Sequence, residues 1–121
     1  DELSGGQRQR EFIAMVIAQD TDYILLDEPL NNLDMKHSVQ IMKTLGKLVD
    51  ELGKTVVIVL HDINFASVYS DRIVALKDGK IVRDGETEEI INTETLNDIY
   101  DMNIPIKRMN NCNICLYFNS N

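Results

Sequence analysis

The sequence contains few cysteines, prolines and aromatic residues, and it has no tryptophan. Two cysteines among 121 residues cannot form a disulfide framework, so a reducing, cytoplasmic setting is expected. Basic residues are also scarce: the sequence has 12 basic and 20 acidic residues, which gives a net charge of −8. This balance argues against a broad nucleic-acid-binding surface. No apolar run approaches the roughly 20 residues that span a bilayer, and the length suits one domain.

Two uninterrupted apolar runs predict strands. The first, residues 23–26, leads directly into Asp27 and Glu28. The second, residues 55–60, leads into His61. Because the first run shows no polar alternation, we expect its strand to be buried on both faces.

A helix is predicted between these two strands. Asp34 is a natural N-cap, apolar residues recur every three or four positions from Met35 to Leu52, and Gly53 stands where a helix-ending glycine is expected. The stripe consists of Met35, Val39, Met42, Leu45, Val49 and Leu52. Strand, helix and strand of these lengths predict a βαβ unit with parallel strands and a right-handed crossover.

The first residues predict a capped helix. Ser4 is a good N-cap, Gly5 and Gly6 let the backbone turn its amides outward, and a helix follows from Gln7 to about residue 19. Residues 12–18 are apolar nearly all round, so we expect this helix to be buried. Its N-terminus suits an anion, although an ordinary glycine-containing cap explains the same residues.

The second half predicts short elements. A short helix is expected at residues 63–69, and Asp78-Gly79 predicts a tight hairpin between strands at 72–76 and 80–83. Asp84-Gly85 predicts a further turn. Two short helices are expected near 87–91 and 94–101, and two strands near 104–108 and 114–118.

The polar residues at the two strand ends suggest chemistry. Ligands of open α/β sheets bind beyond the carboxyl ends of the strands. Adjacent side chains on a strand diverge, so Asp27 and Glu28 could face a metal ion and a water respectively. His61, at the corresponding end of the next strand, could bind a terminal phosphate. The alternative is that His61 is a structural histidine at a strand end, with its hydrogen bonds made to a nearby loop.

The order of these motifs resembles the ABC-type ATPase family over residues 1–85. Residues 3–7 resemble its signature motif, residues 23–27 its Walker B strand, and Glu28 its catalytic glutamate. Residues 31–34 resemble its D-loop, and His61 its switch histidine. The resemblance implies a partial P-loop NTPase (RecA-like) α/β sheet of parallel strands with flanking helices. Residues 86–121 would form a C-terminal tail of helices and a β-hairpin.

The resemblance also implies roles. Asp27 would hold Mg²⁺ through water, Glu28 would act as the general base, and His61 would contact the γ-phosphate of ATP. Ser4, Gly5, Gly6 and Gln7 would bind the γ-phosphate of ATP held by a second copy. Asp34 would reach across that homodimer and couple the two sites.

The phosphate cradle of this family is missing from the sequence. A P-loop needs Gly-x-x-x-x-Gly-Lys-Ser/Thr between a strand and a helix. Gly53-Lys54-Thr55 does not fit, because position 48 is leucine and the triplet follows a helix. We therefore interpret the chain as the C-terminal half of a nucleotide-binding subunit that is inactive alone. The absent P-loop strand would leave unpaired strand edges, which invite dimerisation or strand exchange.

Residues 29–34 and the tail at 104–106 and 114–118 resemble importers of iron–siderophore complexes. This subclass implies an ATPase subunit that works with transmembrane permease subunits at the cytoplasmic face of the membrane, as a peripheral protein. Two alternatives remain: a soluble ABC ATPase that acts on ribosomes or DNA, and a truncated module that pairs with an intact subunit and regulates it.

Two further features have plain interpretations. Cys112 and Cys115 form a C-x-x-C pair, but zinc would need a second pair. His37 is expected on the polar, solvated side of the helix at 35–52.

Overall fold

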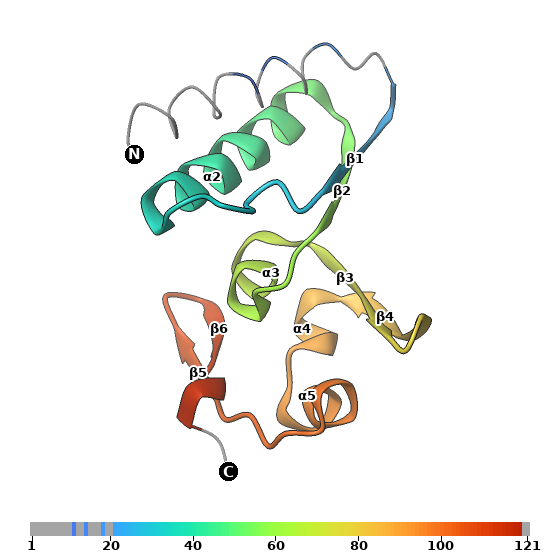
Figure 1. Cartoon of the computed structure of the whole chain (residues 1–121), viewed down its shortest axis with the longest axis vertical. Coiled ribbons are helices and arrows are strands. Elements are labelled where there is room, and N and C mark those ends of the chain that lie inside the picture. The colour runs from blue at the N-terminus through green and yellow to red at the C-terminus, as the bar shows by residue number, and fades with distance from the viewer. Residues whose placement is uncertain (1–10, 12–13, 15–17, 19–20, 120–121) are drawn as a thin grey trace. The chain divides into compact units, whose positions relative to one another are not determined.

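The computed structural model describes Glu11, Ala14, Ala18 and residues 21–119. The chain divides into two compact units, residues 1–61 and 62–121 (Figure 1). Glu11, Ala14 and Ala18 are helical and exposed. The expectation of a helix buried all round is therefore wrong at the two alanines, whose small side chains favour a helix without needing burial. The expected division near residue 85 stays a prediction.

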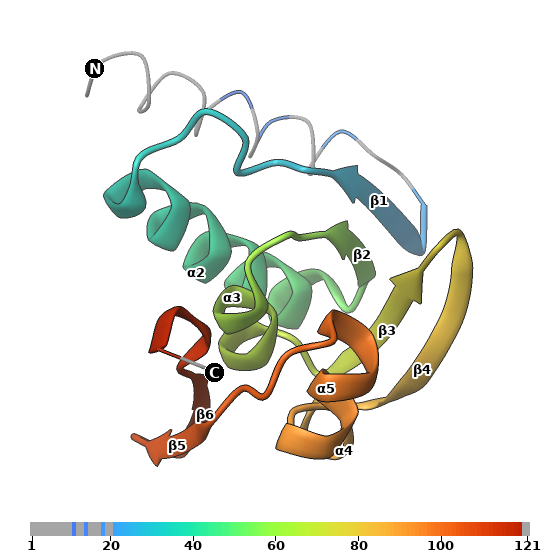
Figure 2. The ribbon, with the colours of Figure 1, turned by 60° about the horizontal axis from the view of Figure 1, so that its bottom comes forward.

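The first unit contains the predicted βαβ arrangement. Strand β1 (Tyr23–Asp27) pairs in parallel with β2 (Thr55–Val59), and helix α2 (Met35–Leu52) connects them. Figure 2 shows the two strand arrows running in the same direction. Tyr23 lies opposite Thr55 and Asp27 lies opposite Val59, so both strands end at the same edge. The predicted parallel pairing is confirmed.

Both ends of α2 follow the sequence prediction. Asp34 has extended backbone angles, and its carboxylate accepts the backbone N–H of His37 at 2.8 Å. Gly53 is left-handed, with φ 64°, and its N–H donates to the carbonyl of Val49 at 2.9 Å. A residue with a Cβ adopts that φ only at a cost, so glycine suits this position.

One face of the β1–β2 sheet carries the core of the first unit. The buried cluster consists of Ile24, Leu26, Ile41 and Leu45, with Leu30, Leu33, Leu48, Val56 and Ile58 packed around it. Met42 and Leu45 of the predicted α2 stripe are buried. Met35 is 82% exposed and Ile41 is buried instead. The buried face of α2 is therefore rotated about the helix axis relative to the face that the sequence predicted.

The prediction that β1 is buried on both faces is wrong. Burial alternates along the strand, and Tyr23 and Leu25 are about 71% and 70% exposed. On β2, Val57 lies opposite Leu25 and Val59 lies opposite Asp27, and both valines are also exposed. The reason is that α2 packs against the face that carries Ile24 and Leu26, and an apolar run does not reveal whether the second face has a cover.

The second unit consists of short elements: α3 (Ile63–Tyr69), β3 (Arg72–Lys77), β4 (Lys80–Glu86), α4 (Thr87–Ile90), α5 (Thr93–Tyr100), β5 (Ile106–Met109), β6 (Cys112–Cys115) and a 3₁₀ turn, η1 (Tyr117–Asn119). The β3–β4 and β5–β6 pairs are antiparallel. Asp78 and Gly79 both have positive φ, as a type I′ hairpin turn requires.

The turn predicted at Asp84-Gly85 is wrong, because both residues lie in β4. Gly85 pairs with Ile73, and a Cβ added at Gly85 would lie 3.2 Å from the Glu89 side chain. The glycine therefore allows a close approach of the following helix rather than a reversal of the chain.

The core of the second unit gathers residues from its helices and from β6. The buried cluster is Ile90, Ile91, Leu96, Ile104 and Cys115. Burial raises the pKa of the Cys115 thiol, and the nearby Asp62 adds to this effect. Both cysteines are free, and Cys115 is buried.

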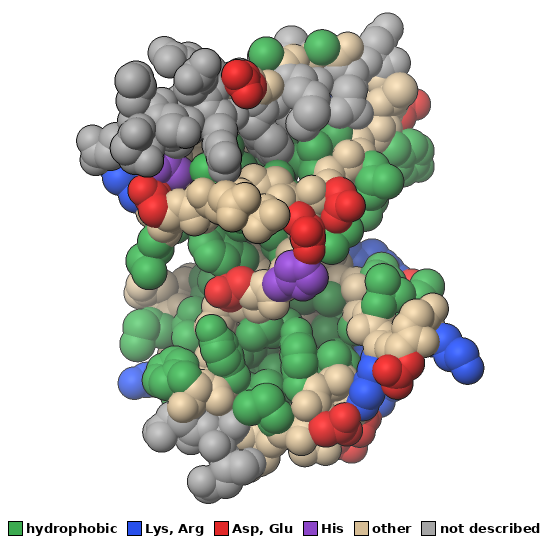
Figure 3. All heavy atoms as spheres, viewed as in Figure 1, with side chains coloured by type: hydrophobic (Ala, Val, Ile, Leu, Met, Phe, Trp, Pro, Cys, Tyr) green, Lys and Arg blue, Asp and Glu red, His purple; other side chains and the backbone are tan. Residues whose placement is uncertain are grey.

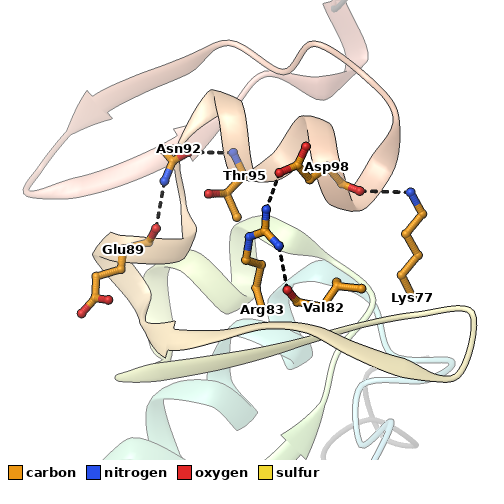
Figure 4. Close-up of polar contacts among 7 residues, drawn as sticks. All are labelled: Lys77, Val82, Arg83, Glu89, Asn92, Thr95 and Asp98. Atoms are coloured by element: carbon orange, nitrogen blue, oxygen red, sulfur yellow. Dashed lines mark hydrogen bonds and ion pairs between the residues drawn. The ribbon is translucent and has the colours of Figure 1, made fainter.

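Polar contacts attach α5 to the β3–β4 hairpin (Figure 4). Arg83 forms an ion pair with Asp98, and its guanidinium also donates to the carbonyl of Val82 at 2.8 Å. Lys77 donates to the carbonyl of Asp98 at 3.0 Å. Asn92 caps α5 by accepting the N–H of Thr95 at 2.7 Å. The helix is therefore held from both strands of the hairpin.

Hydrophobic side chains also reach the surface of the second unit, and Figure 3 shows a group of them on the face in view. Among the helices in the described part of the chain, none is long and apolar enough to cross a membrane.

Candidate nucleotide-hydrolysis site

The β1–β2 register places the predicted polar residues at one edge of the sheet. Asp27 is the last residue of β1 and lies opposite Val59, the last residue of β2. Glu28 follows β1 directly, and His61 comes two residues after β2. The alternating burial of β1 puts Asp27 on the same face as Leu25, so it is exposed to solvent. Neighbouring strand ends thus present two carboxylates and one imidazole.

Glu28 and His61 are in direct contact. Nε2 of His61 is paired with Oε1 of Glu28, and both side chains remain exposed, at 80% and 41% respectively. An ionised carboxylate can only accept hydrogen bonds, so Nε2 carries the proton in this pair. This contact uses Oε1 of the carboxylate and does not involve Oε2.

The backbone at Glu28 is unusual. Its φ is 51°, in the left-handed region that non-glycine residues seldom adopt. Pro29 follows it and disfavours a right-handed helical backbone at Glu28. The N–H of Asn31 donates to the carbonyl of Glu28 at 3.1 Å, which closes a turn immediately after the strand. Backbone strain of this kind gathers at functional sites.

Asp34 lies at the start of α2, in the loop that follows this turn. Its carboxylate is 58% exposed. The hydrogen bond from the backbone of His37 and then the bond from its side chain lower the pKa of Asp34 below the usual range. The carboxylate is therefore ionised at neutral pH, and an exposed anion stands at the N-terminus of the helix.

The prediction that His37 is solvated is wrong. Its side chain is only 7% exposed, and Nδ1 lies 2.8 Å from Oδ1 of Asp34. The sequence did hold a signal for the contact, though not for the burial, because His37 occupies the third helical position after the Asp34 cap, from which a side chain can reach back to the cap. The predicted phosphate-binding residues Ser4, Gly5, Gly6 and Gln7 lie outside the described residues.

The described residues can be tested for a fit to Mg²⁺. They contain no group of three or more histidine, cysteine, aspartate or glutamate side chains that could hold a metal ion. Mg²⁺ does not need such a cage, since it keeps several waters and takes one or two carboxylates together with substrate phosphates. The exposed carboxylate of Asp27 fits this kind of ligand.

Comparisons with known proteins find similar sequences for most of the chain. The family model described as "ABC transporter" matches residues 1–31. The petrobactin import ATP-binding protein YclP of Bacillus subtilis is 72% identical over 118 residues, which are 98% of this chain and 47% of YclP. The chain is similar to ABC transporter ATP-binding proteins. It spans about half the length of the curated relatives that it matches.

A second relative and a solved structure show the same similarity. The petrobactin import ATP-binding protein FatE of Bacillus anthracis is 55% identical over 106 residues, 88% of this chain and 42% of FatE. A dimeric, post-hydrolysis structure of the ATP-binding cassette MJ0796 bound to ADP and Pi matches with a TM-score of 0.58. That match has 46% identity and covers 68% of this chain and 35% of the cassette. The predicted α/β fold class of an ABC cassette is confirmed.

Proposed function

We propose that this chain supplies the Walker B, D-loop and switch-histidine part of an ATP-hydrolysing subunit that powers a membrane importer. The observation that carries the proposal is the contact between Glu28 and His61 at the shared edge of two parallel strands. A carboxylate and an imidazole that meet beyond strand ends are suited to orient a water and a phosphate. The similarity to ABC transporter ATP-binding proteins supports the same reaction.

The three strand-end residues would divide the work. Asp27 would hold Mg²⁺ through water, and Mg²⁺–ATP would supply the phosphoryl group. Glu28 would accept a proton from the attacking water through the carboxylate oxygen that His61 does not engage. His61 would keep the Glu28 side chain oriented and would contact the γ-phosphate.

A second subunit would complete the site. Ser4, Gly5, Gly6 and Gln7 would present a helix N-terminus to the γ-phosphate of the opposite subunit's ATP. Asp34 would couple the two sites across the interface. The dimeric ATP-binding cassette bound to ADP and Pi supports a paired arrangement.

The transported ligand would be an iron–siderophore complex. Both YclP and FatE carry the name of petrobactin import proteins, and this chain is 72% and 55% identical to them. The subunit would work with permease subunits at the cytoplasmic face of the membrane, as a peripheral protein. Binding of ATP would require the P-loop that these 121 residues lack.

A full-length cassette tests the proposal. The chain is fused to the residues that precede the matched stretch of YclP, and Mg²⁺-dependent phosphate release from ATP is measured. Glu28→Gln keeps the size of the side chain but removes the base, so hydrolysis should fall by about 10²-fold or more. Glu51→Gln, at an exposed position of α2, is the matched control and should retain activity. An active Glu28→Gln cassette would refute the assignment.

A further inference from the structure

His37 makes a contact that helix capping does not require. The backbone N–H of His37 already caps α2 by donating to Oδ1 of Asp34 at 2.8 Å. The imidazole Nδ1 lies at the same oxygen, also at 2.8 Å. Any residue could provide the backbone bond. The imidazole is thus a second, side-chain partner for one oxygen of the carboxylate.

The burial of the two side chains is unequal. The His37 side chain is 7% exposed, whereas that of Asp34 is 58% exposed. A buried polar ring has little rotamer freedom and is costly unless it is hydrogen-bonded. The ring is therefore a rigid support beneath a carboxylate that faces outward.

The hydrogen bonding defines the state of the ring. Asp34 is ionised and can only accept, so the proton of His37 must reside on Nδ1. The two bonds that the Asp34 carboxylate accepts from His37 both end on Oδ1. Two donors on one oxygen favour one rotamer of the carboxylate and leave its other oxygen, Oδ2, outside these two bonds.

We propose that His37 is a positioning residue that orients the Asp34 carboxylate so that Oδ2 is presented to the second ATPase subunit. The inference rests on the coupling role proposed for Asp34, and it adds the residue that prepares Asp34 for this role. His37 itself touches neither nucleotide nor the reacting atoms.

Two substitutions distinguish a role of His37 in orienting Asp34 from a role in packing alone. In His37→Asn the side-chain amide nitrogen takes the place of Nδ1 and keeps the donor. His37→Leu keeps the bulk and the backbone cap but removes the donor. In the full-length cassette, His37→Leu should lower kcat about tenfold at unchanged KM for ATP, in line with the cost of a misplaced group. His37→Asn should restore kcat to within about twofold.

A spectroscopic arm uses the 121-residue chain without nucleotide. Long-range ¹H–¹⁵N correlation should find the Nδ1–H form of His37, and the ¹³C signal of the Asp34 carboxyl should move in His37→Leu and return in His37→Asn. An Nε2–H ring, or equal signals in both variants, overturns the inference. So does a cassette in which Glu28→Gln is inactive but His37→Leu is fully active. If the wild-type cassette does not hydrolyse ATP, that result counts against the proposed function. The NMR spectra would then still test the contact between His37 and Asp34.

Discussion

Asn64 pairs with Cys115 as though it were the backbone of an adjacent strand. Oδ1 of Asn64 accepts the backbone N–H of Cys115 at 2.7 Å, and Nδ2 donates to the Cys115 carbonyl at 3.2 Å. Ser67, one turn later on α3, donates to the carbonyl of Asn113 at 2.6 Å. The edge of β6 is therefore covered by side chains of a helix, which removes an unpaired edge.

Replacing Asn64 by Leu should loosen the β5–β6 hairpin. The substitution removes both bonds and leaves the buried Cys115 amide without its acceptor, at a cost of about 1–3 kcal/mol. Hydrogen exchange at the Cys115 amide should accelerate accordingly. Asn97→Leu, at an exposed position of α5, is the control. Unchanged protection of Cys115 in Asn64→Leu would show that the pairing does not stabilise the hairpin.

Asp34 should make the stability of the first unit depend on pH. Hydrogen bonds from His37 lower the folded-state pKa of Asp34 below its ordinary value of 3.8. Its contribution is therefore fully present above that value and is lost as the pH falls through the lower, folded pKa. Asp34→Asn retains a capping side chain but cannot titrate, so its urea midpoint should fall less between about pH 5 and about pH 2. Asp50→Asn, at an exposed position of the same helix, should behave like the wild type.

The 121-residue chain alone should not hydrolyse ATP. It has the strand-end carboxylates and His61 but no Gly-x-x-x-x-Gly-Lys-Ser/Thr cradle to hold the phosphates. Phosphate release from Mg²⁺–ATP by the purified chain should match that of its Glu28→Gln variant. Turnover that disappears in Glu28→Gln would contradict this expectation.

The open face of the β1–β2 sheet should promote self-association. Tyr23, Leu25, Val57 and Val59 are exposed there, and Leu25 lies opposite Val57 in register. Exposed apolar patches and free strand edges favour pairing with another chain. Leu25→Lys should therefore shift sedimentation toward the monomer. Met35→Lys, at an exposed position on α2, should not, and equal effects of the two would argue against this face.

Sequence reasoning located the site better than it located the core. The apolar runs ended in polar residues, and strands that end at one sheet edge bring such residues together, so the meeting of Glu28 and His61 could be expected. Burial on the second face of β1 could not be judged, because an apolar run does not say what packs on either side. The burial of His37 depends on tertiary packing, which helical periodicity alone does not specify.

Gly53 has a consequence for the spacing of the site. The left-handed turn at Gly53 ends α2, and after one further residue β2 begins, with the N–H of Thr55 bonded to the carbonyl of Asp22 at 3.0 Å. The connection between α2 and β2 is only two residues long, so the end of α2 fixes where β2 begins and therefore where His61 lies. A residue inserted between Gly53 and Thr55 would either bulge out or slide β2 by one step. In the second case every side chain of β2 would change face, and the histidine would lose its alignment with Glu28.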